Sequence, residues 1–498
     1  MKLSQVVEHI EPEQIINSNE LKNIEIKGIS YNSKTTKKDD IFVCLVGEHV
    51  DGHAFAINAQ EKGASAIVTQ KTVEGINIPV LIVKDTQLVL AQISSVFYGF
   101  PSEKLRLIGV TGTNGKTTVT HLVENIFEQA GIECGLIGTL GQRLSSKDEY
   151  VSTKHTTPQS PELHEAFRNM LDSGIKHVVM EVSSHALEQH RVGGCLFDAA
   201  ALTNLTQDHL DYHITMDNYF KAKSKLFIAL KDSKENNKYA VINKDDSNAE
   251  RFIQATPDKV RIITYGIENQ ADIIAKNIEY SVYGSKFDCI TPIGNKTINL
   301  QMTGQFSVYN ALAALAIGIG EGIELDTCVR ALELTKSVAG RFEVVIREPL
   351  IIVDYAHTPD GLANVLNAAK KVVPQNGRLI CLFGCGGDRD ATKRPKMGGI
   401  AENIADVVII TSDNPRSEDP QQIITDILTG IKSLNSDKVQ VEIDRRSAIE
   451  LAIKNAGKDD VIVLAGKGHE DYQILKNETI HFDDREEARK AFKKVYSS

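Results

Sequence analysis

A glycine-rich loop between a strand pattern and a helix pattern constrains the fold of this chain more than any other feature. The loop Gly109–Thr118 reads GVTGTNGKTT, the apolar run Leu105–Val110 enters it, and the helical pattern Val119–Gln129 leaves it. Glycines let backbone N–H groups turn toward phosphate oxygens, and the N-terminus of the helix adds the positive end of its dipole. This context predicts a nucleotide-binding loop on a parallel α/β sheet, and ATP is the nucleotide we expect.

The loop departs from the usual G-x-x-x-x-G-K-T pattern at one position. The first glycine of that pattern, five residues before Gly115, is replaced here by Val110. Lys116 would neutralise β- and γ-phosphate charge, and the hydroxyl of Thr117 would ligate Mg²⁺. The alternative is a glycine-rich turn that binds no ligand, but the Lys-Thr pair and both flanks favour phosphate binding.

Composition excludes several classes of protein. The chain has 498 residues with 56 Lys+Arg against 66 Asp+Glu, and the net charge of −10 argues against bulk nucleic-acid binding. It contains no apolar run of about 18 residues that would predict a membrane span, and its start lacks the apolar stretch of a signal peptide. The seven scattered cysteines lack paired zinc-type spacing. We therefore expect a cytoplasmic protein with reduced thiols and with neither membrane nor nucleic acid as a partner.

The length predicts more than one domain, and three segments differ in pattern. Residues 1–100 alternate short β-rich pieces with polar helical stretches, as in a small α/β domain. Residues 101–338 carry continuous apolar runs typical of a buried parallel sheet, with antiparallel strands expected over 272–302. Residues 339–498 hold apolar strands that run into the loops DYAHTPD, GCGGDRD, TSDNPRSEDP and AGKGHED. Because ligands bind beyond the carboxyl ends of such strands, these loops predict one shared ligand face.

Two motifs of the central segment suggest metal binding. Glu181 ends an apolar run, where a lone carboxylate is costly to bury unless a cation meets it. Mg²⁺ bound to nucleotide phosphates would meet it, and the alternative is a neighbouring Arg or backbone partner. His209 and His213 lie four residues apart beside Asp208 and Asp211, which could suggest zinc. Carboxylate- and phosphate-rich sites favour Mg²⁺ or Mn²⁺, so we take His209 as a ligand of a second metal and expect His213 to be structural.

The C-terminal loops carry a mixed set of charges, which suits a zwitterionic small molecule. A carboxylate binds an Arg fork and an amine binds a carboxylate. Arg416 and Asp413 form a compact example, the first for a carboxylate and the second for an ammonium group. The alternative is a set of surface turn residues. The whole set comprises His357, Arg389, Arg394, Arg416, Lys467 and Glu470.

These motifs together resemble a known family. In this order, TGTNGKTT, MEVSSHALEQHRV, TNLTQDHLDYH, GRFE, DYAHTPD, GCGGDRD, TSDNPR and AGKGHE are similar to motifs of the Mur ligases of peptidoglycan synthesis. The resemblance covers nearly the whole chain and is most specific from residue 109 onward; before that it rests mainly on Tyr31–Ser33 and Asp40–His53. It implies three α/β domains: a UDP-binding one, a central ATPase domain, and a Rossmann-like C-terminal domain that receives an amino acid.

The resemblance also implies an activity, and it is closest to the members that extend UDP-N-acetylmuramoyl-L-alanyl-D-glutamate by one amino acid. The γ-phosphate of ATP would pass to the D-Glu γ-carboxylate, and an amine would attack the resulting acyl-phosphate. Arg416, at the fourth position of DNPR, resembles the meso-diaminopimelate adders, because an Arg could clamp the second carboxylate of that amino acid and would repel the distal amine of lysine. We expect a monomeric, Mg²⁺-dependent C–N ligase of cell wall biogenesis, and so of cell shape and cell division.

Carried over residue by residue, the resemblance assigns five groups of site residues. The catalytic group is Lys116, Glu181, His209 and Lys223, and the metal ligands are Thr117, Glu181, His209 and Lys223, the last as a carbamylated lysine. The alternative for the basic stretch Tyr219–Lys223 is a solvated helix face. The ATP contacts are Gly112, Thr113, Asn114, Gly115, Lys116, Thr117, Thr118, Asn310, Arg341 and Asp354. The UDP-muramoyl dipeptide contacts are Ser33, Thr156, Thr157, Ser183, Gln189 and Arg191. The amino-acid pocket is Arg389, Asp413, Asn414, Pro415, Arg416, Gly466 and Glu470.

Two other functions remain open from the sequence. One is a sister ligase that joins glutamate to folate or adds D-Ala-D-Ala to the same precursor, against which MEVSSHALEQHRV and DNPR argue. The other is an ATP-driven switch or binding module that hydrolyses nucleotide without a second substrate. Dependence of ATP hydrolysis on both the dipeptide precursor and diaminopimelate would separate a ligase from a switch.

Overall fold

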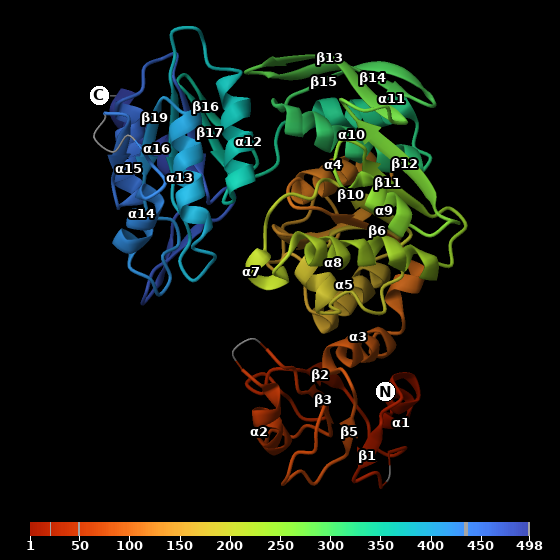
Figure 1. Cartoon of the computed structure of the whole chain (residues 1–498). Helices are drawn as coiled ribbons and strands as arrows, with labels where there is room; N and C mark the ends of the chain where they lie inside the picture. The colour runs from red at the N-terminus through yellow and green to blue at the C-terminus, as the bar shows by residue number, and fades with distance from the viewer. Residues whose placement is uncertain (20, 48–49, 433–436, 497–498) are drawn as a thin grey trace.

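The computed structural model describes residues 1–19, 21–47, 50–432 and 437–496. In this part of the chain the strands form three large sheets, each from one continuous stretch of sequence, and a small hairpin of β22 Tyr472–Ile474 and β23 Thr479–His481. Helices cover the sheets, as Figure 1 shows from the N-terminal part below to the C-terminal part at the upper left. The predicted α/β class is confirmed. The division at residues 100 and 338 stays a prediction.

The N-terminal sheet is small and nearly all parallel. Its order is β1-β5-β4-β3-β2, and of its pairs only β1 with β5 is antiparallel. One face packs against α1 and α3, and the other against α2. The strands are β1 Gln14–Ile16, β2 Gly28–Ser30, β3 Asp40–Val43, β4 Ala66–Thr69 and β5 Val80–Ile82; the helices are α1 Leu3–Ile10, η1 Gly52–Phe55, α2 Ala56–Glu61 and α3 Thr86–Phe97.

The central sheet places the strand of the phosphate loop, β6, near its middle. Its order is β15-β14-β13-β12-β11-β10-β6-β9-β7-β8. In this order, β13, β12, β11, β10, β6, β9 and β7 are parallel to one another. At the two edges, β8, β14 and β15 are antiparallel to their neighbours. The antiparallel strands predicted over 272–302 are therefore confirmed. The strands are β6 Arg106–Thr111, β7 Cys134–Gly138, β8 Gly141–Arg143, β9 His177–Glu181, β10 Ala199–Leu202, β11 Tyr239–Asn243, β12 Arg261–Gly266, β13 Ile273–Ser281, β14 Gly284–Thr291 and β15 Gly294–Leu300.

Helices bury both faces of this sheet. Apolar residues of α4, α10 and α11 pack on one face, and those of α5, α8 and α9 pack on the other. This two-sided burial explains why the parallel strands read as continuous apolar runs. The helices are η2 Pro101–Lys104, α4 Lys116–Gln129, α5 Ser160–Asp172, α6 Ser184–Glu188, α7 Leu210–His213, α8 Met216–Ile228, η3 Ala229–Asp232, α9 Ala249–Ala255, α10 Gln305–Gly320 and α11 Leu325–Leu334.

The C-terminal sheet is doubly wound. Its order is β16-β17-β21-β18-β19-β20, with β16 antiparallel to β17 and the other pairs parallel. Helices α12, α13 and α14 cover one face and α15 and α16 the other. The strands are β16 Glu343–Arg347, β17 Leu350–Asp354, β18 Leu379–Phe383, β19 Val407–Ile410, β20 Val439–Val441 and β21 Val461–Ala465; the helices are α12 Pro359–Lys370, α13 Lys393–Ile404, α14 Pro420–Leu428, α15 Arg445–Lys454 and α16 Asp484–Tyr496.

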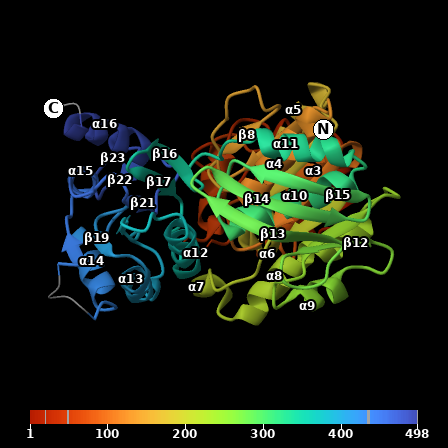
Figure 2. The same ribbon diagram turned by 90° about the horizontal axis from the view of Figure 1, so that it is seen from above.

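The turn between β13 and β14 reaches the C-terminal sheet's domain. Val282 packs against the apolar cluster of that domain, and the Lys371 ammonium lies 4.7 Å from the centre of the Tyr280 ring. Seen from above, α12 lies on the side of the C-terminal part that faces the central part (Figure 2). Among the described residues, none of the helices combines the length and apolarity needed to cross a bilayer.

Candidate active site

Three neighbouring strands of the central sheet bring the predicted loops together. β6 pairs in parallel with β9 on one side and β10 on the other. The phosphate loop, Glu181 and the stretch from Thr203 to His209 therefore emerge at the same edge. β10 ends at Leu202, and the hydroxyl of the next residue, Thr203, donates to the Asn114 carbonyl at 2.6 Å.

The phosphate loop requires glycine at two positions. Gly112 and Gly115 have φ of 148° and 90°. A Cβ would lie 1.8 Å from the Thr203 hydroxyl oxygen at Gly112 and 2.4 Å from Asn310 Oδ1 at Gly115. Gly115 caps α4, which starts at Lys116 instead of the predicted Val119, so the Lys-Thr pair occupies the first turn. The N–H groups of this first turn have no partner within the helix and point toward the loop.

The variant position of the loop has a packing explanation. Val110 lies inside β6 and is fully buried in the apolar cluster beneath α4. A glycine there would remove core contacts and is not needed for the turn, which begins after Thr111. The departure from the usual pattern therefore leaves the phosphate-facing part of the loop intact.

Lys116 lies inside the curl of the loop. Its ammonium donates to the carbonyls of Gly112 and Thr113, each at 2.9 Å. Burial lowers the pKa of Lys116, while the negative charges of Glu181 and Asp208 raise it in part. The amine thus lies among the groups that converge on the predicted phosphate position.

Glu181 and Thr117 form a pair of hard oxygen donors next to this lysine. Glu181 is fully buried and accepts from the Thr117 hydroxyl at 3.1 Å, and from the N–H and hydroxyl of Thr139 at 2.8 and 3.1 Å. Arg341 Nη2, from the C-terminal segment, also donates to the Thr117 hydroxyl oxygen at 3.0 Å. Hydroxyl and carboxylate oxygens are the ligands Mg²⁺ prefers, so this donor set fits the predicted metal.

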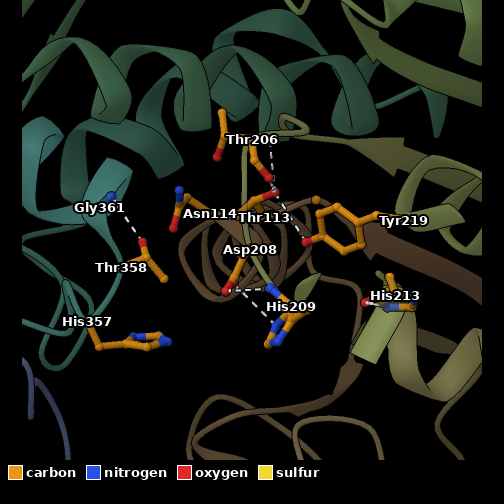
Figure 3. Close-up of polar contacts among 12 residues, drawn as sticks. Thr113, Asn114, Thr206, Asp208, His209, His213, Tyr219, His357, Thr358 and Gly361 are labelled. Atoms are coloured by element: carbon orange, nitrogen blue, oxygen red, sulfur yellow. Dashed lines mark hydrogen bonds and ion pairs between the residues drawn. The ribbon is translucent and has the colours of Figure 1, made fainter. Parts of the chain in front are cut away.

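Among the described residues, those predicted to bind a second metal do not form a cluster of ligands. His209 has a left-handed φ of 53° at the start of α7, and its Nε2 lies 3.2 Å from Asp208 Oδ2. Burial lowers the pKa of His209 to about 4, which favours the neutral imidazole that ligates metals. No group of three or more His, Cys, Asp or Glu side chains arranged to hold a metal occurs in the described residues. His213 instead pairs with the Ser184 hydroxyl at 2.9 Å in the interior, which suits a structural role (Figure 3).

Lys223 is buried, which the alternative of a solvated face does not allow. It is 1% exposed, and its amine donates to the Gly112 carbonyl at 2.8 Å. Burial and the nearby positive charge of Lys116 lower the pKa of Lys223 well below its usual value. Lys221, on the same helix, has a 67% exposed side chain, so the patch divides into one solvated lysine and one interior amine.

The C-terminal segment contacts the phosphate loop through α12. Asp360 Oδ2 accepts from the Asn114 side-chain amide at 2.9 Å and from the Thr206 hydroxyl at 3.0 Å. Figure 3 shows His357, Thr358 and Gly361 of this segment opposite Asn114, Thr206 and Asp208 of the central domain. Thr358 caps the helix by accepting from the Gly361 N–H at 3.1 Å, which holds Asp360 in the first turn.

Asp354 and Asn310, two further predicted nucleotide contacts, line the same region. Asp354 ends β17 and accepts from the N–H groups of Phe342 and Ala356 at 2.7 and 2.8 Å, so it orients the turn that carries Arg341. Burial raises the pKa of Asp354, and the charge of Arg341 offsets part of that rise. Asn310 lies on α10 beside Gly115.

The residues predicted for the amino-acid pocket meet because β18, β19 and β21 are neighbours in the sheet. Asn414 Nδ2 donates to Glu470 Oε2 at 2.8 Å, and the buried Lys467 ammonium reaches the same oxygen at 3.2 Å. Arg416 donates to the Gly387 carbonyl at 2.8 Å. Burial, together with the charge of Asp413, raises the pKa of Glu470.

Two arginines of the mixed-charge set differ in their surroundings. Arg389 is exposed beside Gly386, where Arg416 also lies. Arg394 is 2% exposed and pairs with Glu418 at 2.9 Å and Asp426 at 2.8 Å. Two carboxylates therefore pair with the terminal nitrogens of Arg394, although its buried Nε has no hydrogen-bond partner among the described residues. We interpret Arg394 as a structural residue instead of a ligand contact. Pro415 lies in the interior between Asn414 and Arg416.

The predicted dipeptide contacts form a hydrogen-bonded group beside Glu181. The Thr157 hydroxyl donates to the Glu181 carbonyl at 2.9 Å and accepts from the Ser183 N–H at 3.0 Å. Arg191 donates to Gln189 Oε1 at 2.6 Å and to the Thr157 carbonyl at 3.2 Å. The Thr156 hydroxyl oxygen lies 3.1 Å from the hydroxyl oxygen of Thr139, which itself donates to Glu181. Ser33 lies apart in the N-terminal sheet's domain, where the hydroxyl of nearby Tyr31 donates to Glu162 of α5 at 2.6 Å.

Comparisons with known proteins agree with this geometry. The Mur ligase middle domain matches residues 110–318, the Mur ligase glutamate ligase domain matches 340–468, and the Mur ligase family catalytic domain matches 25–98. The chain belongs to the Mur ligase family. A UDP-N-acetylmuramoyl-L-alanyl-D-glutamate--2,6-diaminopimelate ligase of Bacillus velezensis is 48% identical over 495 residues and 99% of both chains. One of Listeria monocytogenes serotype 4b is 47% identical over 498 residues and 99% of both.

Solved structures give the same family. A UDP-N-acetylmuramoyl-L-alanyl-D-glutamate--2,6-diaminopimelate ligase superposes with a TM-score of 0.68 at 32% identity, over 99% of both chains. MurF ligase from Thermotoga maritima in complex with ADP has a TM-score of 0.64 at 20% identity, over 95% of this chain and 99% of that one. At that identity the second likeness concerns the fold alone.

Sequence reasoning missed two contacts of this Mur ligase. Asp360 closes the DYAHTPD motif, but its partners Asn114 and Thr206 are distant in sequence. The sequence identifies Lys467 only as one member of the mixed-charge set. In the structure its ammonium is fully buried between Asn414 and Glu470. An aspartate just after an N-capping Thr-Pro would have signalled a first-turn carboxylate, though not its partners.

Proposed function

We propose that this Mur ligase joins meso-diaminopimelate to UDP-N-acetylmuramoyl-L-alanyl-D-glutamate with ATP, as one step of peptidoglycan precursor synthesis. The observation that carries the proposal is the contact of the phosphate loop with the domain that holds the mixed-charge loops. Asn114 and Thr117 of the phosphate loop bond to Asp360 and Arg341 of the C-terminal segment. The neighbouring loops of that segment carry Arg416, Asp413 and Glu470, which suit a zwitterion. The names of the relatives, which span the same full length, support the same reaction.

The reaction needs ATP because a carboxylate is a poor electrophile. The D-Glu γ-carboxylate oxygen forms a bond to the γ-phosphorus while the bond to the β-phosphate oxygen breaks, and ADP leaves. The amine nitrogen then bonds to the acyl carbon, loses a proton, and inorganic phosphate leaves with the electrons of the broken C–O bond. Lys116 and Arg341 are placed to offset the crowded negative charge of the first step.

Mg²⁺ would be held by Thr117 and Glu181, with His209 and Lys223 as ligands of a second ion. When bound, the metal would polarise the phosphate oxygens and neutralise their charge. For Lys223 we propose carbamylation, in which the neutral amine adds CO₂ and loses a proton. The interior position and lowered pKa of Lys223 support this, since only the unprotonated amine is nucleophilic.

We assign the three functions to residues 1–100 for UDP-substrate binding, 101–338 for ATP and 339–498 for the amino acid. The dipeptide would lie along Thr156, Thr157, Ser183, Gln189 and Arg191, whose hydrogen bonds end next to Glu181. The amino acid would meet Arg389, Asn414 and Gly466 as well as Arg416. We further propose a cytoplasmic monomer, since its substrates are small soluble molecules.

Dependence of ADP release on substrates tests this proposal. With ATP and Mg²⁺ alone we expect release near background, and full turnover only after both the dipeptide precursor and diaminopimelate are added. Full turnover with ATP alone would favour the switch. Turnover with glutamate and folate, or with D-Ala-D-Ala, but not with diaminopimelate, would favour a sister ligase.

A further inference from the structure

A fully buried ion pair lies beneath the proposed amino-acid pocket. Arg445 begins α15 and Asp484 begins α16, and both side chains are 0% exposed. Arg445 donates from Nε to Asp484 Oδ1 at 2.8 Å and from Nη2 to Oδ2 at 2.6 Å. Burying such a pair is costly unless further hydrogen bonds satisfy the charges. The other contacts of the guanidinium therefore indicate what the pair does.

Those other contacts hold the ends of two strands. Arg445 Nη2 donates to the carbonyl of Ala465, the last residue of β21, at 3.1 Å. Nη1 reaches the carbonyl of Ser412, just after β19, at 3.5 Å. The next residues along the chain are Gly466 and Asp413, both of the proposed pocket. One side chain thus fixes the two carbonyls that precede them.

Gly466 and Asp413 lie so close together that the backbone at Gly466 has no room for a side chain. A Cβ on Gly466 would lie 2.6 Å from Asp413 Oδ2, and the φ of Gly466 is 117°. The Asp413 carboxylate therefore lies directly over the Gly466 backbone. A small displacement of either strand end would move this carboxylate relative to Asn414 and Glu470, which are themselves hydrogen-bonded.

The guanidinium of Arg445 also lies near the carboxylates of the proposed pocket. Burial alone would lower the pKa of Arg445, but the negative charges of Asp484, Asp413 and Glu470 raise it above its usual value. The guanidinium is therefore a permanent cation within electrostatic reach of both pocket carboxylates.

We propose that Arg445 and Asp484 are positioning residues for the incoming amino acid, because they set the spacing of Asp413 and Gly466 from beneath without touching the ligand. The inference rests on the proposed function. It adds that affinity for the amino acid depends on this pair, while phosphorylation of the dipeptide does not.

The double variant Arg445→Met/Asp484→Leu tests the inference. Replacing a buried ion pair by apolar residues of similar volume often leaves a fold stable, so this variant separates positioning from stability. Hydroxylamine measures phosphorylation by itself: its nitrogen attacks the acyl-phosphate, phosphate leaves, and a hydroxamate forms without use of the amino-acid pocket. Arg378→Met is the matched control, because Arg378 pairs with Asp460 at 2.7 Å at the opposite ends of β18 and β21.

We expect the KM for diaminopimelate to rise about tenfold or more in the double variant, equivalent to about 1.4 kcal/mol. Its KM for ATP and its hydroxamate formation should stay near wild type, and the control should change none of the three. An unchanged KM for diaminopimelate, or a parallel fall in hydroxamate formation, would overturn the inference. If the double variant does not fold, Arg445→Lys is measured in its place. A rise in the KM for diaminopimelate alone would support the inference, and an unchanged KM for diaminopimelate would overturn it. A wild-type chain that forms hydroxamate but no tripeptide with diaminopimelate would remove the proposed function and this inference with it.

Discussion

We expect the C-terminal domain to close over ATP, because proposed contacts to the nucleotide lie on two domains. Removal of the Asp360 carboxylate should weaken this closure. The carboxylate accepts hydrogen bonds from Asn114 of the phosphate loop and from Thr206, and both cross between domains. Hydrogen bonds to a charged group contribute about 1.5–3 kcal/mol each when buried. Because Asp360 is partly exposed, we take about 2 kcal/mol for the two together, which is a shift of about 30-fold in the closure equilibrium.

Fluorescence energy transfer between the two domains measures this shift in Asp360→Ala. All seven native cysteines are buried, so cysteines introduced at the exposed positions Lys259 and Lys458 would take the dyes. We expect the concentration of ATP needed for half-maximal closure to rise and kcat to fall, each by about 10- to 30-fold.

Asp326→Ala is the matched control for this experiment. Asp326 also lies in the first turn of a helix, α11, but its partner Lys296 belongs to the same domain. Both variants therefore lose a negative charge that interacts favourably with the helix dipole. Only Asp360→Ala also loses hydrogen bonds between two domains. Wild-type closure and kcat in Asp360→Ala would refute the reasoning.

Three other substitutions test the proposed site. Lys116→Ala should abolish phosphate transfer, because it removes the ammonium that lies inside the curl of the loop, and ADP formation near wild type would count against that role. Lys223→Ala should lose most activity while Lys221→Ala keeps it, and intact-mass measurement of the wild-type chain in bicarbonate should detect one added CO₂ that the Lys223 variant lacks. Arg416→Ala should cost diaminopimelate binding about 2–5 kcal/mol and ATP binding far less; an equal loss for both would make Arg416 structural.

The sequence predicts the local elements of this fold well where one pattern dominates. Continuous apolar runs identify the parallel strands, since burial on both faces leaves no polar alternation. Boundaries are less certain, because they depend on side chains from elsewhere. The start of α4 at Lys116, before the predicted Val119, depends on the left-handed Gly115, which belongs to no apolar pattern and whose neighbours Asn310 and Thr203 are distant in sequence.

Burial and long-range pairing are harder to predict. Lys221 and Lys223 are alike in the sequence, yet only the fold decides that one is solvated and the other lies beneath the phosphate loop. Arg394 looks like a ligand contact until its two carboxylate partners on and near α14 are known. A motif indicates which residue types occur at a site. The pairing of side chains across the fold decides which of these residues can still bind a ligand.

Competition between two amino acids in one reaction shows which of them this ligase joins to its substrate. The chain would be incubated with ATP, Mg²⁺ and UDP-N-acetylmuramoyl-L-alanyl-D-glutamate, together with equal amounts of meso-diaminopimelate and lysine, and the product would be weighed by mass spectrometry. The account predicts a product with the mass of the diaminopimelate tripeptide and almost none of the lysine one. A product containing lysine, or no tripeptide beside rapid ADP release, would contradict it.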